Sequence, residues 1–236
     1  MKLIALDANS EHLYSRMVVA SALASAGLLI LMVGIGFSSG VSQQYFELVT
    51  DLNVYAEQML EGAAMLRLIL ALDNVFIACY CTMLIALIAR VWDNRLVIPL
   101  LVILSASLLG GFLDYVENHH ILSMLLSLEN GIQLNAEQVQ SQMVQSALKW
   151  HLAYFSFFLL GCLLQAKGFV QTVFKYSLIL WQLPLGVVVY TTWGTALGEW
   201  AFYLRYLNLA FGFVFFAILC SAELEPKGVR ANMART

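Results

Sequence analysis

Charged residues are scarce in this sequence. Only 11% of its 236 residues are Asp, Glu, Lys or Arg, whereas 61% are hydrophobic. A soluble domain carries about 25% charged residues, so the composition excludes an ordinary soluble globular protein. The net charge of −3 leaves no basic face for binding nucleic acid. The composition instead predicts an integral membrane protein with the lipid bilayer as its partner and no nucleic acid.

Several motifs that would name a reaction are missing. No phosphate-binding glycine loop, nucleophile elbow or dinucleotide fingerprint occurs, and neither does His-x-x-x-His or Cys-x-x-Cys. The four cysteines all lie in apolar runs, where they are typical of small packing residues. The sequence therefore predicts no particular cofactor and no particular substrate.

Long apolar runs are what the sequence does contain. A helix of about 20 apolar residues crosses the hydrocarbon core of a bilayer. The chain supplies six candidate spans, and no internal repeat divides them, so we predict an all-α integral membrane protein, a six-transmembrane-helix bundle forming a single membrane domain over residues 1–236. The predicted spans cover about 17–37, 67–89, 96–120, 150–165, 169–190 and 200–222. Pro184 predicts a kink in the fifth.

Two polar excursions separate these spans. In residues 38–66, apolar side chains such as Phe46, Leu52 and Met59 recur at near-helical spacing among acids, which predicts an amphipathic helix on the membrane surface or over the helix ends. In residues 127–148, Asn135 and Gln138 form a capping-box pattern. We expect this second polar helix to run straight into the fourth span.

The distribution of positive charge predicts the topology. Nine of the twelve cationic residues fall on the side of the termini: Lys2, Arg16, Arg90, Arg95, Lys167, Lys175, Lys227, Arg230 and Arg235. The positive-inside rule then places both termini in the cytoplasm (N-in, C-in), with the two amphipathic helices extracytoplasmic, after the first and third spans. The absence of a cleavable presequence and the clean charge bias favour a multi-pass protein of the bacterial inner membrane.

The stretch Gly110–His120 holds the densest set of ionisable groups in any apolar segment. On a helix, Asp114, Glu117 and Asn118 share one face, with His120 at its margin. Carboxylates near the hydrocarbon core are costly, so an ionisable residue there is a site hypothesis by default.

The predicted topology brings further polar groups to the same outer end of the bundle. The candidate pocket residues are Asp73, Asn74, Asp114, Glu117, Asn118, His120, Lys149, His151 and Arg205. Within this set we predict that Asp73, Asp114, Glu117, Asn118 and His151 share one outer-facing pocket. Such a pocket, lying between the helices of a bundle, would bind or process a small molecule, a lipid or a cation.

Three interpretations of these residues stay open. They can form a structural network of ion pairs, in an accessory subunit that docks other subunits of a membrane complex. They can be catalytic, with Asp114 or Glu117 as general base beside His120 or His151. They can bind a cation or a proton for transport. The weak candidates for metal ligands are Asp73, Glu117, His120 and His151. A zinc site normally needs about three protein ligands, and these residues could supply them only if the fold brings them together.

Overall fold

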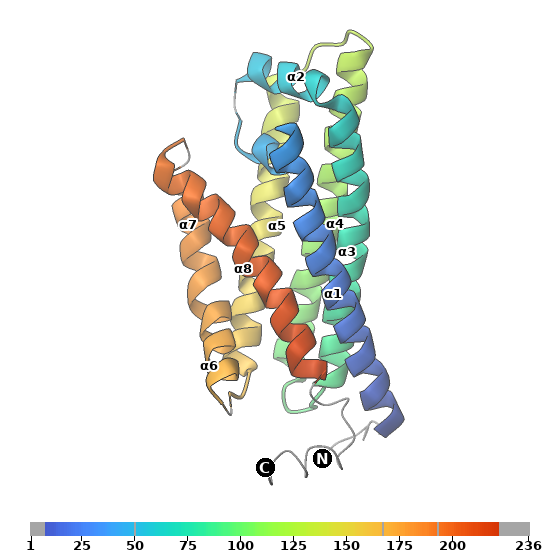
Figure 1. Cartoon of the computed structure of the whole chain (residues 1–236), viewed down its shortest axis with the longest axis vertical. Helices are drawn as coiled ribbons and strands as arrows, with labels where there is room; N and C mark the ends of the chain where they lie inside the picture. The colour runs from blue at the N-terminus through green and yellow to red at the C-terminus, as the bar shows by residue number, and fades with distance from the viewer. Residues whose placement is uncertain (1–7, 50, 167, 193, 222–236) are drawn as a thin grey trace.

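The computed structural model describes residues 8–49, 51–166, 168–192 and 194–221, and every regular element within these ranges is helical (Figure 1). The elements in chain order are α1 (Ala8–Ser39), the 3-10 helix η1 (Gln43–Glu47), α2 (Leu52–Glu61), α3 (Ala63–Arg90), α4 (Val97–Glu129), α5 (Ala136–Leu163), α6 (Phe169–Tyr176), the π-helical segment η2 (Ser177–Trp181), α7 (Gln182–Thr192) and α8 (Ala196–Ser221).

Six helical segments are long and apolar enough to cross a membrane, which confirms the predicted class of a polytopic, all-helical membrane protein. They are Ser10–Ser39, Ala63–Arg90, Val97–Glu129, Ala136–Leu163, Phe169–Thr192 (α6, η2 and α7 together) and Ala196–Ser221. Several helices are longer than the predicted spans. In particular, α4 continues to Glu129 rather than ending near residue 120, because its last turns pack their apolar side chains into a second core.

The spans form a bundle in which α1 packs against α3 and α8, and α4 packs against α3 and α5. The fifth span lies beside α8 and α5. In Figure 1, α1 begins and α8 ends at one end of the bundle, whereas α2 lies at the opposite end. The predicted cytoplasmic termini fall in residues 1–7 and 222–236, and with Lys167 they lie outside the described residues.

Small side chains let α1 approach its neighbours closely. Ala22, Ser25 and Ala26 are buried against the bundle, as expected for a helix that packs through small residues in lipid. The glycines of the same helix contribute less, because no neighbouring atom lies within 4 Å of a Cβ built on Gly27 or Gly34. The close packing of α1 therefore rests on alanine and serine.

The first excursion folds over the end of the bundle instead of extending away from it. Asp51 caps α2 by accepting hydrogen bonds from the backbone N–H groups of Asn53 and Val54. Tyr55 and Met59 on α2 are fully buried and pack with side chains from η1, α3, α4 and α5. Of the two placements predicted for this segment, packing over the helix ends is the observed one.

The second excursion is the first part of α5. Asn135 and Gln138 form the predicted capping box, with each side chain bonded to the other residue's backbone N–H. The helix then continues without a break to Leu163, so the polar helix and the fourth span are one element, as expected. Gln142, Lys149 and Trp150 therefore lie on one continuous helix.

The fifth span departs from α-helical geometry just before Pro184. The proline has no N–H, and its ring crowds the carbonyl four residues earlier, at Leu180. The π-helical turn at Ser177–Trp181 lies at this position. Such a turn relieves the clash within a span, so the structure shows a local change of helix type at the position where a kink was predicted.

Candidate functional site

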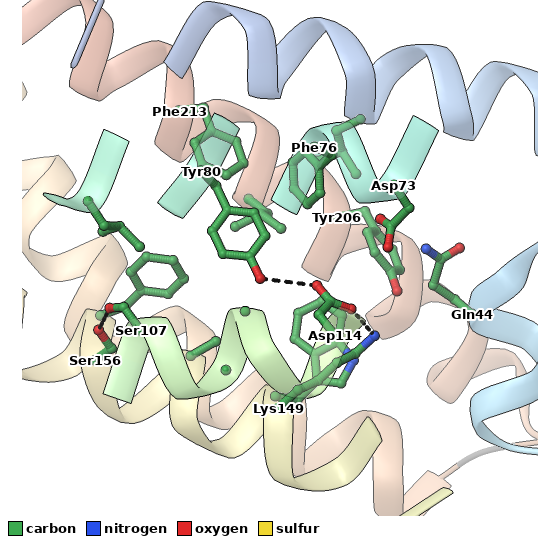
Figure 2. A pocket seen from close by; sticks show the side chains of 18 residues that line it. Gln44, Asp73, Phe76, Tyr80, Ser107, Asp114, Lys149, Ser156, Tyr206 and Phe213 are labelled. Carbon is green, nitrogen blue, oxygen red and sulfur yellow. Dashed lines mark hydrogen bonds and ion pairs between the residues drawn. The ribbon is translucent and has the colours of Figure 1, made fainter. Parts of the chain in front are cut away.

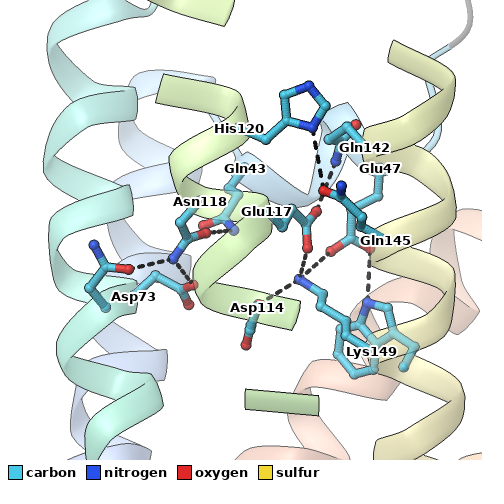
Figure 3. A network of polar contacts seen from close by, with 12 residues as sticks. Gln43, Glu47, Asp73, Asp114, Glu117, Asn118, His120, Gln142, Gln145 and Lys149 are labelled. Atoms are coloured by element: carbon cyan, nitrogen blue, oxygen red, sulfur yellow. Dashed lines mark hydrogen bonds and ion pairs between the residues drawn. The ribbon is translucent and has the colours of Figure 1, made fainter. Parts of the chain in front are cut away.

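Lys149 of α5 is the centre of a buried ion-pair network. Its Nζ lies 2.5 Å from Glu117 Oε2, 2.8 Å from Asp114 Oδ1 and 3.2 Å from Glu47 Oε1 (Figure 3). Asp114 and Glu117 are three residues apart on α4, so both face α5, as predicted. Glu47 comes from η1. The network therefore joins three segments that are distant in the sequence.

Arg205 of α8 extends this network on the side of Glu47. Its side chain is 1% exposed, and its Nη2 lies 3.5 Å from Glu47 Oε2. The guanidinium carbon stands 3.8 Å from the centre of the Trp150 ring, which is the geometry of a cation–π contact. Trp150 in turn donates a hydrogen bond from Nε1 to Glu47 Oε2 at 3.0 Å. Glu47 thus has both cations beside it.

Asp73 of α3 is held in a different way. It is 4% exposed and accepts a 2.8 Å hydrogen bond from Asn118 Nδ2. The same amide group donates to Asn74 Oδ1 at 3.0 Å, and Gln43 Nε2 donates to Asn118 Oδ1 at 2.5 Å. Within the described part of the chain, no Lys, Arg or His makes an ion pair with Asp73. Amide groups hold this carboxylate in place of a direct ion pair.

The cluster as a whole contains more acid than base. Four buried or partly buried carboxylates surround two cations: Glu47, Asp73, Asp114 and Glu117 against Lys149 and Arg205. Burying an uncompensated charge costs far more than a hydrogen bond returns. Protons or bound cations must therefore make up at least part of the difference.

A cavity opens directly beside this cluster. It has a volume of about 90 Å³ and lies between α1, α3, α4, α5 and α8, with Gln44 of η1 at one end (Figure 2). By the same measure one water molecule needs roughly 10–15 Å³, so the cavity has room for several waters or a small ligand. Asp73, Asp114 and Lys149 line its polar end. The site is therefore accessible space and not only a packed network.

The walls change character along the cavity. Tyr80 donates a 3.1 Å hydrogen bond to Asp114 Oδ2 at the polar end. The hydroxyls of Ser107 and Ser156 pair with each other at 2.5 Å farther along α4 and α5. The remaining wall is mainly apolar and aromatic, with Leu84 and Phe213 among its members. Gly110 and Gly111 of α4 also line the cavity.

The structure brings most of the sequence-predicted residues together. Asp114, Glu117 and Lys149 are in direct contact, and Asp73, Asn74 and Asn118 form the adjoining amide cluster. Arg205 reaches the network only through Glu47. His120 lies at the margin, where its Nδ1 is 3.3 Å from Gln145 Oε1.

The prediction that His151 shares this pocket is wrong. His151 is exposed, its Nδ1 lies 2.6 Å from the carbonyl oxygen of Ala147 on its own helix, and its ring stacks on Tyr190. The reason is helical geometry: two residues along a helix turn through about 200°, so His151 points away from the core when Lys149 points into it. A carboxylate–histidine pair with His151 is therefore not formed.

The predicted metal ligands do not converge either. Among the described residues, no group of three or more His, Cys, Asp or Glu side chains is arranged to hold a metal ion. Of the four candidates, Asp73 and Glu117 belong to the buried cluster, His120 stands at its edge and His151 is outside it. The acids of the cluster are arranged around Lys149 and Asn118 instead.

Sequence reasoning missed Glu47, Gln43 and Gln142. Gln142 Nε2 donates a 2.8 Å hydrogen bond to Glu117 Oε1, and Tyr55 completes the chain by donating to Gln142. Burial and the nearby Glu117 raise the pKa of the Tyr55 phenol, so it stays a neutral donor. Gln142 was detectable, because it precedes Lys149 by two helical turns on the same face. Glu47 carried no such signal, since the other acids of its segment look alike in the sequence.

No protein-family model, curated protein or solved structure matches this chain.

Proposed function

We propose that the protein binds a small molecule within the membrane, in the cavity between α1, α3, α4, α5 and α8. The observation that carries this proposal is Asp73: a buried carboxylate that makes no ion pair with the described residues lines a cavity large enough for a ligand. Packing alone does not favour such an arrangement, because an apolar side chain at this position would avoid the cost of the charge.

The proposal includes the orientation of the bundle. The polar cluster and α2 face the extracytoplasmic side, the termini are cytoplasmic, and the protein resides in the cell membrane. The support is the charge bias of the sequence together with the positive-inside rule. A membrane-impermeant thiol reagent tests it on intact cells. An Asn53→Cys variant is expected to be labelled from outside, and an Asp93→Cys variant, in the link between α3 and α4, only after the cells are opened.

Filling the cavity tests the binding function. Ala153 lines the cavity, so Ala153→Phe, or the smaller Ala153→Leu, takes up its space. Ala78 is exposed on the outside of α3, and Ala78→Phe is the matched control. Native mass spectrometry of the wild type released from nanodiscs is expected to show a bound small molecule that the control keeps and the filling variants lose. Retention of that molecule by folded Ala153→Phe and Ala153→Leu proteins would refute the proposal.

A second candidate function is supported by Lys149. Its three carboxylate partners tie η1 to α4 and α5, which is what a purely structural network in an accessory subunit would do. The double variant Asp114→Asn with Glu117→Gln separates the two candidates. Lost folding or lost assembly with other subunits favours the structural role, whereas an intact protein that no longer binds its small molecule favours the site.

A further inference from the structure

The cavity is elongated along the bundle axis. Asp114 and Ser107 are seven residues apart on α4, and Lys149 and Ser156 are seven apart on α5. Each pair therefore spans about 10 Å along its helix. The charged residues gather at one end of this length, and apolar side chains dominate the rest (Figure 2). An occupant that matches these walls has a small polar head and an extended apolar body.

The charge of the polar end selects the sign of the head. Lys149 already has three carboxylate partners, and Arg205 is covered by Trp150 and Glu47. Asp73 and Asp114 both line the cavity, and Asp73 makes no ion pair with the described residues. An anionic head would add to an existing excess of negative charge. A cationic head would reduce that excess and would meet Asp73 at the wall.

Three apolar side chains lie between the cavity and a second, smaller space. Phe157, Leu209 and Phe213 line this cavity and also line a second, smaller one beside Ser177 and Asn208. These three side chains thus form the partition between the two spaces. Phe213 also makes an edge-to-face contact with Phe76 at 5.7 Å, which fixes its ring. An apolar chain that runs toward Phe213 would meet this partition.

We propose that the ligand is an amphiphilic amine, with its ammonium group at Asp73 and a linear apolar chain running toward Phe213. This inference rests on the proposed function and specifies the class of molecule that the cavity takes. The ammonium group would then lie beside the carboxylates of Asp73 and Asp114, and the chain would lie against the apolar walls. The partition then limits the chain length that binds best.

The head group is tested with a set of probes that share one tail. Octylamine, octanol and octanoate are titrated by calorimetry into the protein in nanodiscs, with empty nanodiscs correcting for partition into lipid. We expect octylamine to bind about tenfold or more tightly than octanol, because one partner of a buried charge pair is missing from the alcohol. Octanoate is expected not to bind above the reference.

Asp73→Asn is the informative variant, because it keeps the shape and the hydrogen bond to Asn118 while removing the charge. It is expected to lower the affinity for octylamine to that for octanol and to leave octanol unchanged. Glu57→Gln, at an exposed acid of α2, is the matched control and is expected to bind octylamine like the wild type. Equal loss in both variants would refute the role of Asp73.

The tail is tested with hexylamine, octylamine and decylamine. Burying one methylene group is worth about fourfold in affinity, so the affinity is expected to rise along the series until the chain meets the partition. Phe213→Ala joins the two cavities and is expected to move the best chain length upward. If the affinity keeps rising with chain length equally in the wild type and in Phe213→Ala, the amines partition into lipid. That result would contradict a site of limited length.

The outcomes separate this inference from the function on which it rests. If octylamine and octanol bind equally and Ala153→Phe abolishes both, the cavity is a binding site but its ligand is not selected as a cation, and the inference fails alone. If no probe binds and Ala153→Phe also leaves the co-purified molecule in place, both fail. Tight octylamine binding that Asp73→Asn and Ala153→Phe each remove supports both.

Discussion

Glu117 and Asp73 are buried carboxylates on neighbouring helices, and they are stabilised by different partners. Glu117 has Lys149 at 2.5 Å and Gln142 at 2.8 Å, whereas the partners of Asp73 among the described residues are amide donors (Figure 3). In the first arrangement, the negative charge of Glu117 is paired with a cation inside the protein. In the second arrangement, the carboxylate of Asp73 lies at a cavity wall without a direct ion pair to the described residues. One cluster thus ties helices together through ion pairs on one side and leaves a carboxylate at a cavity wall on the other.

Among the variants that test this difference, removal of Lys149 is expected to lower the stability of the protein most. Lys149→Met leaves three carboxylates without their shared cation, and breaking a buried pair costs about 3–5 kcal/mol. Thermal unfolding in detergent measures the loss. Arg67→Met is the control, since the Arg67–Glu129 pair is exposed and its loss is expected to change little. Similar stability of the two variants would show that the Lys149 network does not stabilise the fold.

The next effect concerns the close approach of α3 and α4, which brings Asp73 beside Asp114. A Cβ on Gly111 would lie 2.6 Å from Cys81 Sγ. Gly111→Ala is therefore expected to lose about 1 kcal/mol or more of the free energy of unfolding, even after the helix-propensity gain of alanine. Adding Cys81→Ala should restore the stability.

Gly110→Ala is the matched control for this pair of glycines. The nearest atom to its added Cβ is at 3.6 Å, so the variant is expected to be as stable as the wild type or more so. Equal effects of the two alanines in denaturant or thermal unfolding would contradict the account of the α3–α4 contact.

Asp73→Asn should change stability much less than Lys149→Met. The asparagine oxygen still accepts from Asn118, and the substitution removes a charge that no described cation neutralises. We expect the free energy of unfolding without ligand to stay within about 1 kcal/mol of the wild type, or to increase. The same unfolding measurement checks it. A loss as large as that of Lys149→Met would mean that Asp73 is a structural partner and not an open one.

The smallest effect is expected at His151. His151→Ala removes an exposed ring that lies outside the cluster, so the stability should change by no more than about 0.5 kcal/mol. Binding of the co-purified molecule or of octylamine should also be unchanged. A loss of binding would mean that His151 belongs to the binding site, which would contradict its position outside the cluster.

The class of fold was predictable because it follows from apolar length alone. Six spans, the capping box at Asn135 and the disturbance at Pro184 each follow from local chemistry that needs no tertiary information. The extent of α4 was less predictable. Its last turns are largely apolar and stay helical because Ile121, Met124 and Leu125 pack with buried side chains of α2, which only the fold reveals.

The site was predictable where one helix holds the residues in register. Asp114, Glu117 and Asn118 follow from their spacing on α4. The need of buried acids for a cation pointed to Lys149, Arg205 and Arg67, of which Arg67 instead pairs with the exposed Glu129. The prediction for His151 used only its depth in the membrane, which does not tell which way a side chain points around the helix axis. His151 therefore lies at the predicted level of α5 but on the opposite face. Glu47 was hidden because its burial depends on how η1 folds back onto Trp150.

The most direct measurement is a crystal structure of the protein with octylamine that carries bromine on its last carbon. The account predicts the nitrogen within about 3.2 Å of the Asp73 carboxylate, and the anomalous signal of bromine beside Phe157 and Phe213. An amine bound with its nitrogen away from Asp73, or bromine found only on the lipid-facing surface of the bundle, would contradict it.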